Sequence, residues 1–162
     1  MHQPPTARGV IAFVATLWAC FTVAEQPLHA LVGSESAVHD RVNQVRHQHE
    51  LNALRGNDAL AAVARAHAEE MAREGYLSHV NPRGQNPLQR VQAAGISGFR
   101  LLAENIGATS KSGDRVDEIV RGWMNSPIHR ENVLNPAFNS SGVAVVETAT
   151  GTTIAVQLYA TY

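Results

Sequence analysis

The sequence predicts an α+β fold, with helices in the first two-thirds of the chain and β-strands in the last third. In the helical part, apolar residues recur three or four positions apart. From Gly142 onward, β-branched and small residues alternate instead, which is the period of a strand. Helices and strands that are segregated in this way predict a layered architecture with an antiparallel sheet.

Composition indicates one ordinary globular domain. The 162 residues are 44% hydrophobic and 17% charged, and a chain of this length can bury a core without disulfides. Thirteen Lys and Arg residues stand against 14 Asp and Glu residues. Because this balance is close to neutral, we expect no nucleic-acid partner.

The N-terminus has the pattern of an export signal. Val10 to Ala24 is an uncharged run of 15 residues, shorter than the roughly 20 residues that a membrane-spanning helix needs. We therefore expect a signal peptide over residues 1–24, a short tether over 25–34 and the folded domain over 35–162. The mature protein would be secreted or periplasmic and would have no membrane span. The alternative is an uncleaved anchor.

Cys20 is the only cysteine, and it lies inside the predicted signal peptide. The preceding Leu17-Trp18-Ala19 resembles a lipoprotein box, so lipidation at Cys20 is a second possibility for the N-terminus. Cleavage after Ala24 would leave a mature chain with no cysteine and therefore no disulfide. Export without disulfides is typical of bacteria, so we expect a bacterial source.

Five helices are expected from apolar spacing and from residues that favour helix ends. In the first, Val38, Val42 and Val45 form the apolar stripe. Gly75 is expected to end the second, whose buried face includes Leu60 and His67. The predicted ranges are 36–49, 58–74, 87–94, a helix that begins at Gly113-Asp114 and a short helix from Pro127 to about Asn135.

The other segments predict breaks, a loop and a hairpin. Residues 55–57 break the chain between the first two helices, and residues 76–86 are rich in Gly, Pro and Asn, as loops are. Residues 101–108 are short and apolar with a polar pair in their middle. Residues 142–147 and 153–159 alternate and are separated by a turn, which predicts a β-hairpin.

Several reactive sites can be excluded from the sequence. The chain has no HEXXH, P-loop, CxxC or Gly-x-Ser-x-Gly motif. His47 and His49 are two positions apart, so on a helix their rings diverge and cannot share one ion. His67 lies on an apolar helix face, which favours a core histidine over a ligand.

Three segments carry a recognisable pattern. The first is Ser78-His-Val-Asn-Pro82, followed by Asn86-Pro-Leu-Gln-Arg90; the second is Ala103-Glu-Asn-Ile-Gly107; the third is Trp123-Met-Asn-Ser-Pro-Ile-His-Arg-Glu-Asn-Val-Leu-Asn-Pro136. In this order they resemble the bacterial branch of the CAP/SCP family of cysteine-rich secretory proteins. The resemblance covers residues 37–159 and implies an α-β-α sandwich, in which helices flank a three- to four-stranded antiparallel sheet.

The resemblance also implies a cleft lined by two histidines and two acidic residues, which in several family members holds a divalent metal. His79, Glu104 and His129 match three of these positions, and Gln89 occupies the fourth, where relatives usually carry an acid. We therefore expect binding residues His79, Gln89, Glu104 and His129, and metal ligands His79, Glu104 and His129. Two imidazoles and a carboxylate are a common ligand set for Zn²⁺. The alternative is a structural network that ties the Glu104 segment to the helices.

Two functions of different class follow, and the one we favour is a non-catalytic exported binding module. Its cleft would take Zn²⁺ or another divalent cation, or a small ligand; the resemblance makes a lipid, a sterol or a cell-wall component possible partners. The other is a peptidase-like hydrolase in which His129 or a metal-bound water acts as base and Glu104 as orienter or acid. Gln89 argues against an enzyme, because acid–base work by paired carboxylates needs two of them. A purely structural surface protein is a third possibility.

Overall fold

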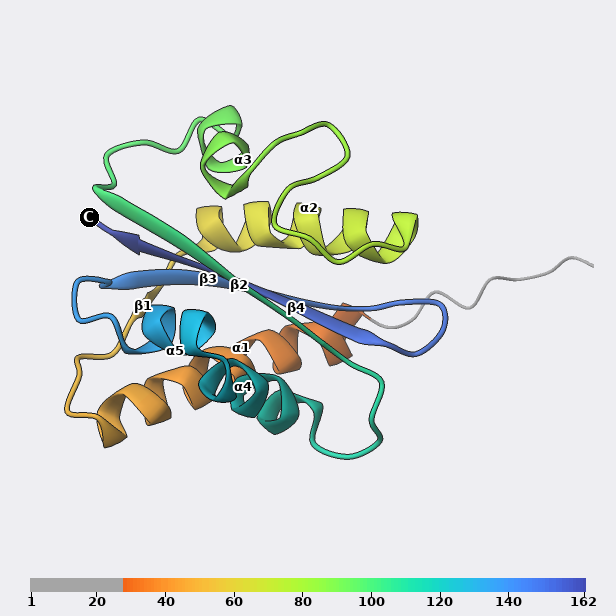
Figure 1. The fold of residues 1–162 in the computed structure, drawn as a ribbon, viewed down its shortest axis with the longest axis horizontal. Helices are drawn as coiled ribbons and strands as arrows, with labels where there is room; N and C mark the ends of the chain where they lie inside the picture. The colour runs from red at the N-terminus through yellow and green to blue at the C-terminus, as the bar shows by residue number, and fades with distance from the viewer. Residues whose placement is uncertain (1–27) are drawn as a thin grey trace, which may run out of the picture.

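The computed structural model describes residues 28–162. The predicted signal peptide, its cleavage after Ala24 and the lipidation site at Cys20 lie outside these residues. Within the described residues, five helices and four strands follow one another along the chain (Figure 1). They are α1 (Leu28–Gln48), β1 (Arg55–Gly56), α2 (Asp58–Glu74), α3 (Pro87–Ala93), β2 (Leu101–Thr109), α4 (Arg115–Asn125), α5 (Pro127–Leu134), β3 (Ser140–Glu147) and β4 (Thr153–Thr161).

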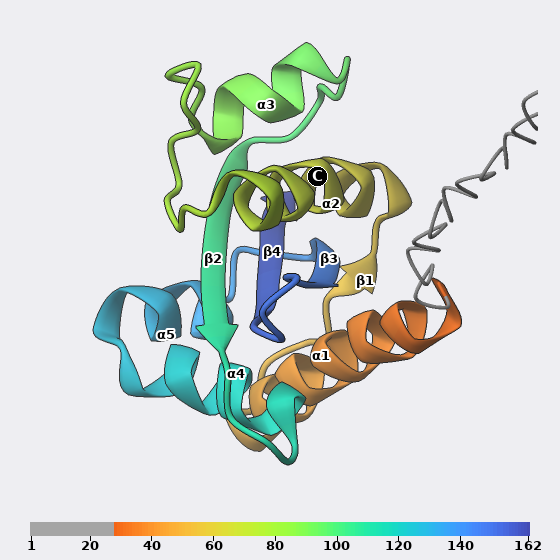
Figure 2. The ribbon, with the colours of Figure 1, turned by 90° about the vertical axis from the view of Figure 1, so that its right-hand side faces the viewer.

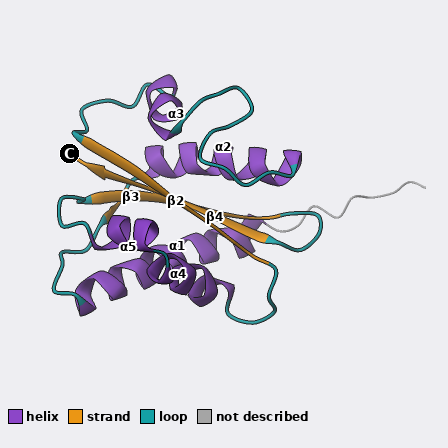
Figure 3. Ribbon diagram, in the orientation of Figure 1, coloured by secondary structure: helices purple, strands orange, loops and turns teal. Residues whose placement is uncertain are grey.

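The elements form three layers, which confirms the predicted α-β-α sandwich. The sheet lies in the middle, with α1, α4 and α5 on one face and α2 with α3 on the other (Figures 1 and 2). The separation of helical and strand segments along the chain can be followed in Figure 3. Among the described helices, none combines the length and the apolar character needed to cross a membrane.

The strand order is β1-β3-β4-β2, so β2 and the two-residue β1 are the edges of the sheet. The β3–β4 and β2–β4 pairs are antiparallel, and Glu147 lies opposite Thr153 at the hairpin turn. β1 runs parallel to β3, so the sheet is mixed and not wholly antiparallel as predicted. Two residues are too few to show a strand period, which is why residues 55–57 looked only like a break.

The hairpin strands divide their side chains between two hydrophobic clusters, because alternate residues of a strand point to opposite faces. Val143 and Val145 of β3 pack with α1, α4 and α5, whereas Ala144 and Val146 pack with α2. α2 approaches β3 closely: a Cβ on Gly142 would lie 2.1 Å from the backbone nitrogen of Ala61. A glycine at this position is therefore a packing requirement.

The helix predictions hold except at the start of α1. α2 matches its predicted range, with Asn57 as the N-cap and Gly75 in the left-handed conformation at its end. The predicted stripe of α1 is buried. α1 begins at Leu28, however, so residues 28–34 of the predicted tether are helical. The glycine at position 33 does not end the helix, because a glycine in a helix interior costs only about 1 kcal/mol.

Candidate functional site

The candidate site is built around the middle of the edge strand β2, where Glu104 and Asn105 are neighbours. The side chain of Glu104 contacts the 76–86 loop and α3, and that of Asn105 contacts α5. The alternation of a strand thus sends two polar residues to opposite faces of the sheet, and each holds one of the predicted histidines.

On the first face, both oxygens of the Glu104 carboxylate are engaged. Oε1 accepts a hydrogen bond from His79 Nδ1 at 2.8 Å, and Oε2 accepts one from Arg90 Nη2 at 2.6 Å. The Glu104 side chain is 1% exposed, so the guanidinium supplies the counter-charge that a buried carboxylate requires. The predicted pairing of His79 with Glu104 is therefore present.

Arg90 is the organising residue of this face. Besides Glu104, it reaches two carbonyls of the 76–86 loop: Nη1 donates to His79 O at 2.7 Å and to Gln85 O at 2.9 Å. One side chain thus fixes both the carboxylate and the loop that carries the imidazole. The His79 side chain is 48% exposed, so the ring faces solvent. Its Nδ1 is hydrogen-bonded to Glu104, and Nε2 lies on the opposite side of the ring.

On the second face, a neutral network positions His129. Asn105 is fully buried, and its Nδ2 donates to His129 O at 3.0 Å and to Tyr159 Oη at 3.2 Å. Asn132 Nδ2 donates to Asn105 Oδ1 at 2.9 Å, which closes the network on α5. Burial raises the pKa of Tyr159 far above its usual value, so its hydroxyl stays protonated and donates to Gln157 Oε1 at 2.9 Å.

The two histidines meet at the edge of the sheet. The centroids of their rings are 6.4 Å apart and the ring planes are inclined by 41°. Partial burial, and after it the charge of His79, lowers the pKa of His129. Near neutral pH the His129 ring is therefore uncharged and offers a lone pair, as a metal ligand or a hydrogen-bond acceptor must.

Gln89 has a local role in this structure. Its Oε1 accepts from the Asn86 backbone N–H at 2.9 Å, and its own backbone N–H donates to Asn86 Oδ1 at 2.9 Å. This capping box starts α3, and Gln89 is exposed. The side chain is thus engaged in capping, and its participation in the cleft stays a prediction.

The geometry also bears on the predicted metal ligands. Across residues 28–162, no three His, Cys, Asp or Glu side chains are grouped so that they could hold one ion. Glu104 already has a partner on each oxygen, and its bond to His79 is the kind by which carboxylates orient a metal-binding imidazole from outside the metal shell. In this structure Glu104 is a hydrogen-bond partner of both His79 and Arg90, and metal binding by His79, Glu104 and His129 stays a prediction.

The sequence motifs assign Arg90 no role in the site. The signal was present, because Glu104 lies in an apolar segment and a carboxylate buried there needs a cation. His67 is a core histidine as predicted: it is 1% exposed, and its Nε2 donates to Ser78 O at 2.9 Å.

The chain is similar to known proteins both in sequence and in structure. A family model described as the cysteine-rich secretory protein family (CAP) matches residues 39–159. The uncharacterized protein YkwD of Bacillus subtilis is 34% identical over 113 residues, which are 70% of this chain and 42% of YkwD. The chain therefore spans less than half of this relative's length.

Two solved bacterial structures have a similar fold. An extracellular protein containing a SCP domain from Bacillus anthracis is 30% identical, with a TM-score of 0.71 over 82% of this chain and 41% of that one. An outer surface protein from Borrelia burgdorferi is 24% identical, with a TM-score of 0.71 over 80% of this chain and 92% of that one.

Proposed function

The chain belongs to the cysteine-rich secretory protein (CAP) family, of the type found in bacteria, and we propose that it is an exported, non-catalytic binding protein whose cleft binds a divalent metal ion. His79 and His129 would hold the ion, and Glu104 would orient His79. One observation carries the proposal: His79 Nδ1 is bound to a buried carboxylate while the His129 ring lies 6.4 Å from the His79 ring.

The donor set suits a metal such as Zn²⁺. Imidazole nitrogens are common Zn²⁺ ligands, and a carboxylate on the second ring nitrogen fixes the tautomer and raises the basicity of the ligand. The lowered pKa of His129 keeps that ring free of a proton at neutral pH. A divalent ion held by two imidazoles would supply a Lewis-acidic position to an oxygen or nitrogen of a small ligand.

Export is supported by two kinds of observation. The N-terminal segment has the composition of a signal peptide. Two proteins of similar structure are described as extracellular and as an outer surface protein. We therefore propose a secreted or periplasmic location.

A binding role is favoured over the hydrolase alternative. A carboxylate-held imidazole such as His79 is an arrangement that general bases also use. The second acid of the cleft is replaced by Gln89, however, and its side chain caps α3 in this structure. Both carboxylate oxygens of Glu104 are engaged, by His79 and Arg90, so neither is directed at a substrate position.

Calorimetric titration of Zn²⁺ into the purified domain tests the proposal. We expect the wild-type protein to bind one ion, and His129→Ala to weaken binding at least tenfold, because one of two protein donors is lost. His49→Ala is the matched control, since His49 is exposed in the turn after α1, and it should bind as wild type does. Binding should also weaken as pH falls below about 6.5, because a protonated imidazole is not a ligand.

Two results would contradict the metal site. Equal affinity in the wild type and in His129→Ala would mean that zinc binds elsewhere. An affinity that does not change between pH 7.5 and pH 5 would mean that imidazoles are not the ligands. Either result would favour the structural network.

A further inference from the structure

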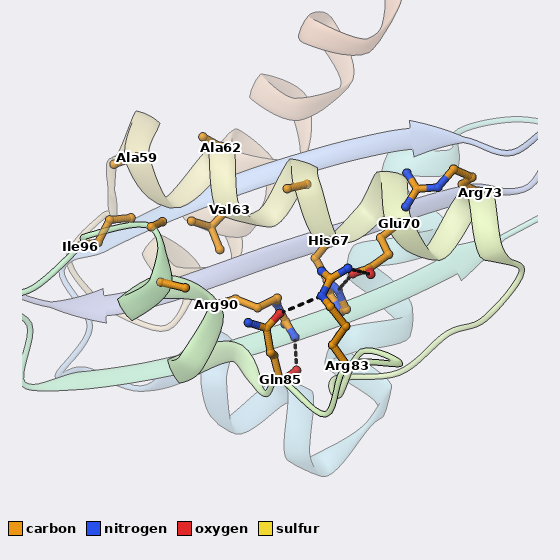
Figure 4. A pocket seen from close by; sticks show the side chains of 13 residues that line it. Ala59, Ala62, Val63, His67, Glu70, Arg73, Arg83, Gln85, Arg90 and Ile96 are labelled. Atoms are coloured by element: carbon orange, nitrogen blue, oxygen red, sulfur yellow. Dashed lines mark hydrogen bonds and ion pairs between the residues drawn. The ribbon is translucent and has the colours of Figure 1, made fainter.

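A concave site lies between α2 and α3, and Arg90 of the candidate site forms part of its wall. It is an open groove of about 520 Å³, which is within the usual range for small-molecule sites (Figure 4). Its apolar part on α2 is formed by Ala59, Ala62, Val63 and Ala66, which are three or four positions apart and so lie on one helix face. Alanines leave this face hollow where larger side chains would fill the space.

At the other end of the groove, His67 carries a buried acceptor with no partner. Its Nε2 donates to Ser78 O, so Nδ1 carries the lone pair of the neutral ring. The His67 side chain is 0% exposed and Nδ1 has no hydrogen bond; Glu70 Oε2, itself an acceptor, lies 4.0 Å away. Burial, followed by the charge of Arg90, lowers the pKa of His67, so this nitrogen is not protonated at neutral pH.

Arg90 provides the complementary group. Its two Nη atoms donate hydrogen bonds to Glu104, His79 and Gln85, but its Nε is buried without an acceptor. Arg90 lines the same groove as His67, and its charge acts on the His67 ring. His67 Nδ1 and Arg90 Nε are thus an acceptor and a donor in the wall that lack hydrogen-bond partners, and a buried polar group without a partner is unfavourable.

The arginines of the groove already have anionic partners. Arg83 pairs with Glu70 at 3.0 Å, Arg90 with Glu104 at 2.6 Å, and Arg73 with Glu74 at 3.1 Å. An anionic or cationic ligand would have to compete with one of these ion pairs. A neutral ligand competes for none of these charged partners, so the charge pattern favours a ligand without net charge.

We propose that the α2–α3 groove binds a neutral amphiphilic small molecule. The apolar body of the ligand lies along the alanine face of α2, and an uncharged amide or hydroxyl group donates to His67 Nδ1 and accepts from Arg90 Nε. Both atoms lie below the surface, so the polar group enters where a side chain of the groove shifts. Arg83 fits this role, because it is 66% exposed, belongs to the 76–86 loop and reaches across to Glu70 (Figure 4).

Hexanamide is a suitable probe, with hexanoate and hexylamine as charged analogues of the same chain length. In an ¹H–¹⁵N NMR titration of the folded domain at pH 7.5, hexanamide should shift the amides of Ala62, Ala66 and Ala93 in a saturable way. The two charged analogues should bind at least tenfold more weakly.

Filling the groove supplies the second arm of the test. Ala66 is exposed, so Ala66→Leu should fold normally while it occupies the groove, and it should weaken hexanamide binding at least tenfold. Ala53→Leu is the control, because Ala53 is exposed outside the groove and should leave binding unchanged.

Three outcomes would overturn the proposal. Hexanoate or hexylamine binding as tightly as hexanamide would refute the neutral head group. Equal hexanamide binding by Ala66→Leu and the wild type would refute the groove as the site. Shifts that rise linearly to the solubility limit would show that hexanamide has no site there.

Discussion

The two histidines of the candidate site are held in different ways. His79 is held on its ring, by a buried ionic cluster of Glu104 and Arg90. His129 is held on its backbone carbonyl, by the neutral amide of Asn105. Neighbouring residues of one strand thus support the two sides, one through charge and one through a network without formal charge. We therefore expect the loss of one partner to cost more stability on the His79 side, where it leaves a buried charge uncompensated, than on the His129 side, where it removes individual hydrogen bonds.

The largest effect on stability is expected when Arg90, the cation on the His79 side, is removed. Arg90→Met leaves the Glu104 carboxylate buried without its counter-charge, and we expect a loss of about 3–5 kcal/mol in the free energy of unfolding. Urea denaturation measures it. The double variant Arg90→Met/Glu104→Gln should regain part of the loss, because no buried charge remains.

Arg73→Met is the matched control for that measurement. Arg73 also forms an ion pair, with Glu74, but its side chain is 66% exposed. Exposed pairs contribute about 0–1 kcal/mol, so this variant should unfold nearly as the wild type does. If Arg90→Met were no more costly than Arg73→Met, the ionic cluster would not be what holds the His79 side.

The neutral side should respond less strongly. Asn105→Ala removes the hydrogen bonds to His129 O and Tyr159 Oη, and it leaves a partly buried carbonyl and a buried hydroxyl without this donor. We expect a loss of about 2 kcal/mol, the order of one or two unsatisfied buried polar groups. Asn52→Ala on an exposed loop is the control, with a change below about 0.5 kcal/mol. A loss larger than that of Arg90→Met would reverse the comparison.

The fold is predictable from the sequence wherever local chemistry decides the structure. The range of α2 follows from the cap at Asn57 and the left-handed Gly75, both of which act over a few residues. The parallel strand β1 could not be predicted, because its two residues are defined only by backbone hydrogen bonds to β3, more than 80 positions away.

The candidate site, like the fold, was predictable from the sequence only in part. Its histidines and Glu104 were found from motifs, and the structure brings His79 to Glu104 and to His129. The role of Arg90 was missed, because spacing places an arginine on a helix but does not identify a carboxylate 14 residues away as its partner. Periodicity identifies a buried face, and it does not identify the polar contacts made within that face.

The smallest change in stability, and a direct test of the metal proposal, is expected from Gln89→Glu. Glutamate suits this position as well as glutamine does, because its carboxylate can accept the same bond from the Asn86 N–H and interacts favourably with the N-terminus of α3. The free energy of unfolding should therefore change by less than about 0.5 kcal/mol. If a divalent ion binds at His79 and His129, and residue 89 lines that site as the family resemblance implies, a new carboxylate there should tighten Zn²⁺ binding in calorimetry. Gln89→Ala is the paired control, since it loses the capping bond without adding charge, and it should lower stability without tightening zinc binding.

Unchanged zinc affinity in Gln89→Glu together with a lower melting temperature would show that the new charge meets only Glu104, and that His79, Glu104 and His129 are a structural network.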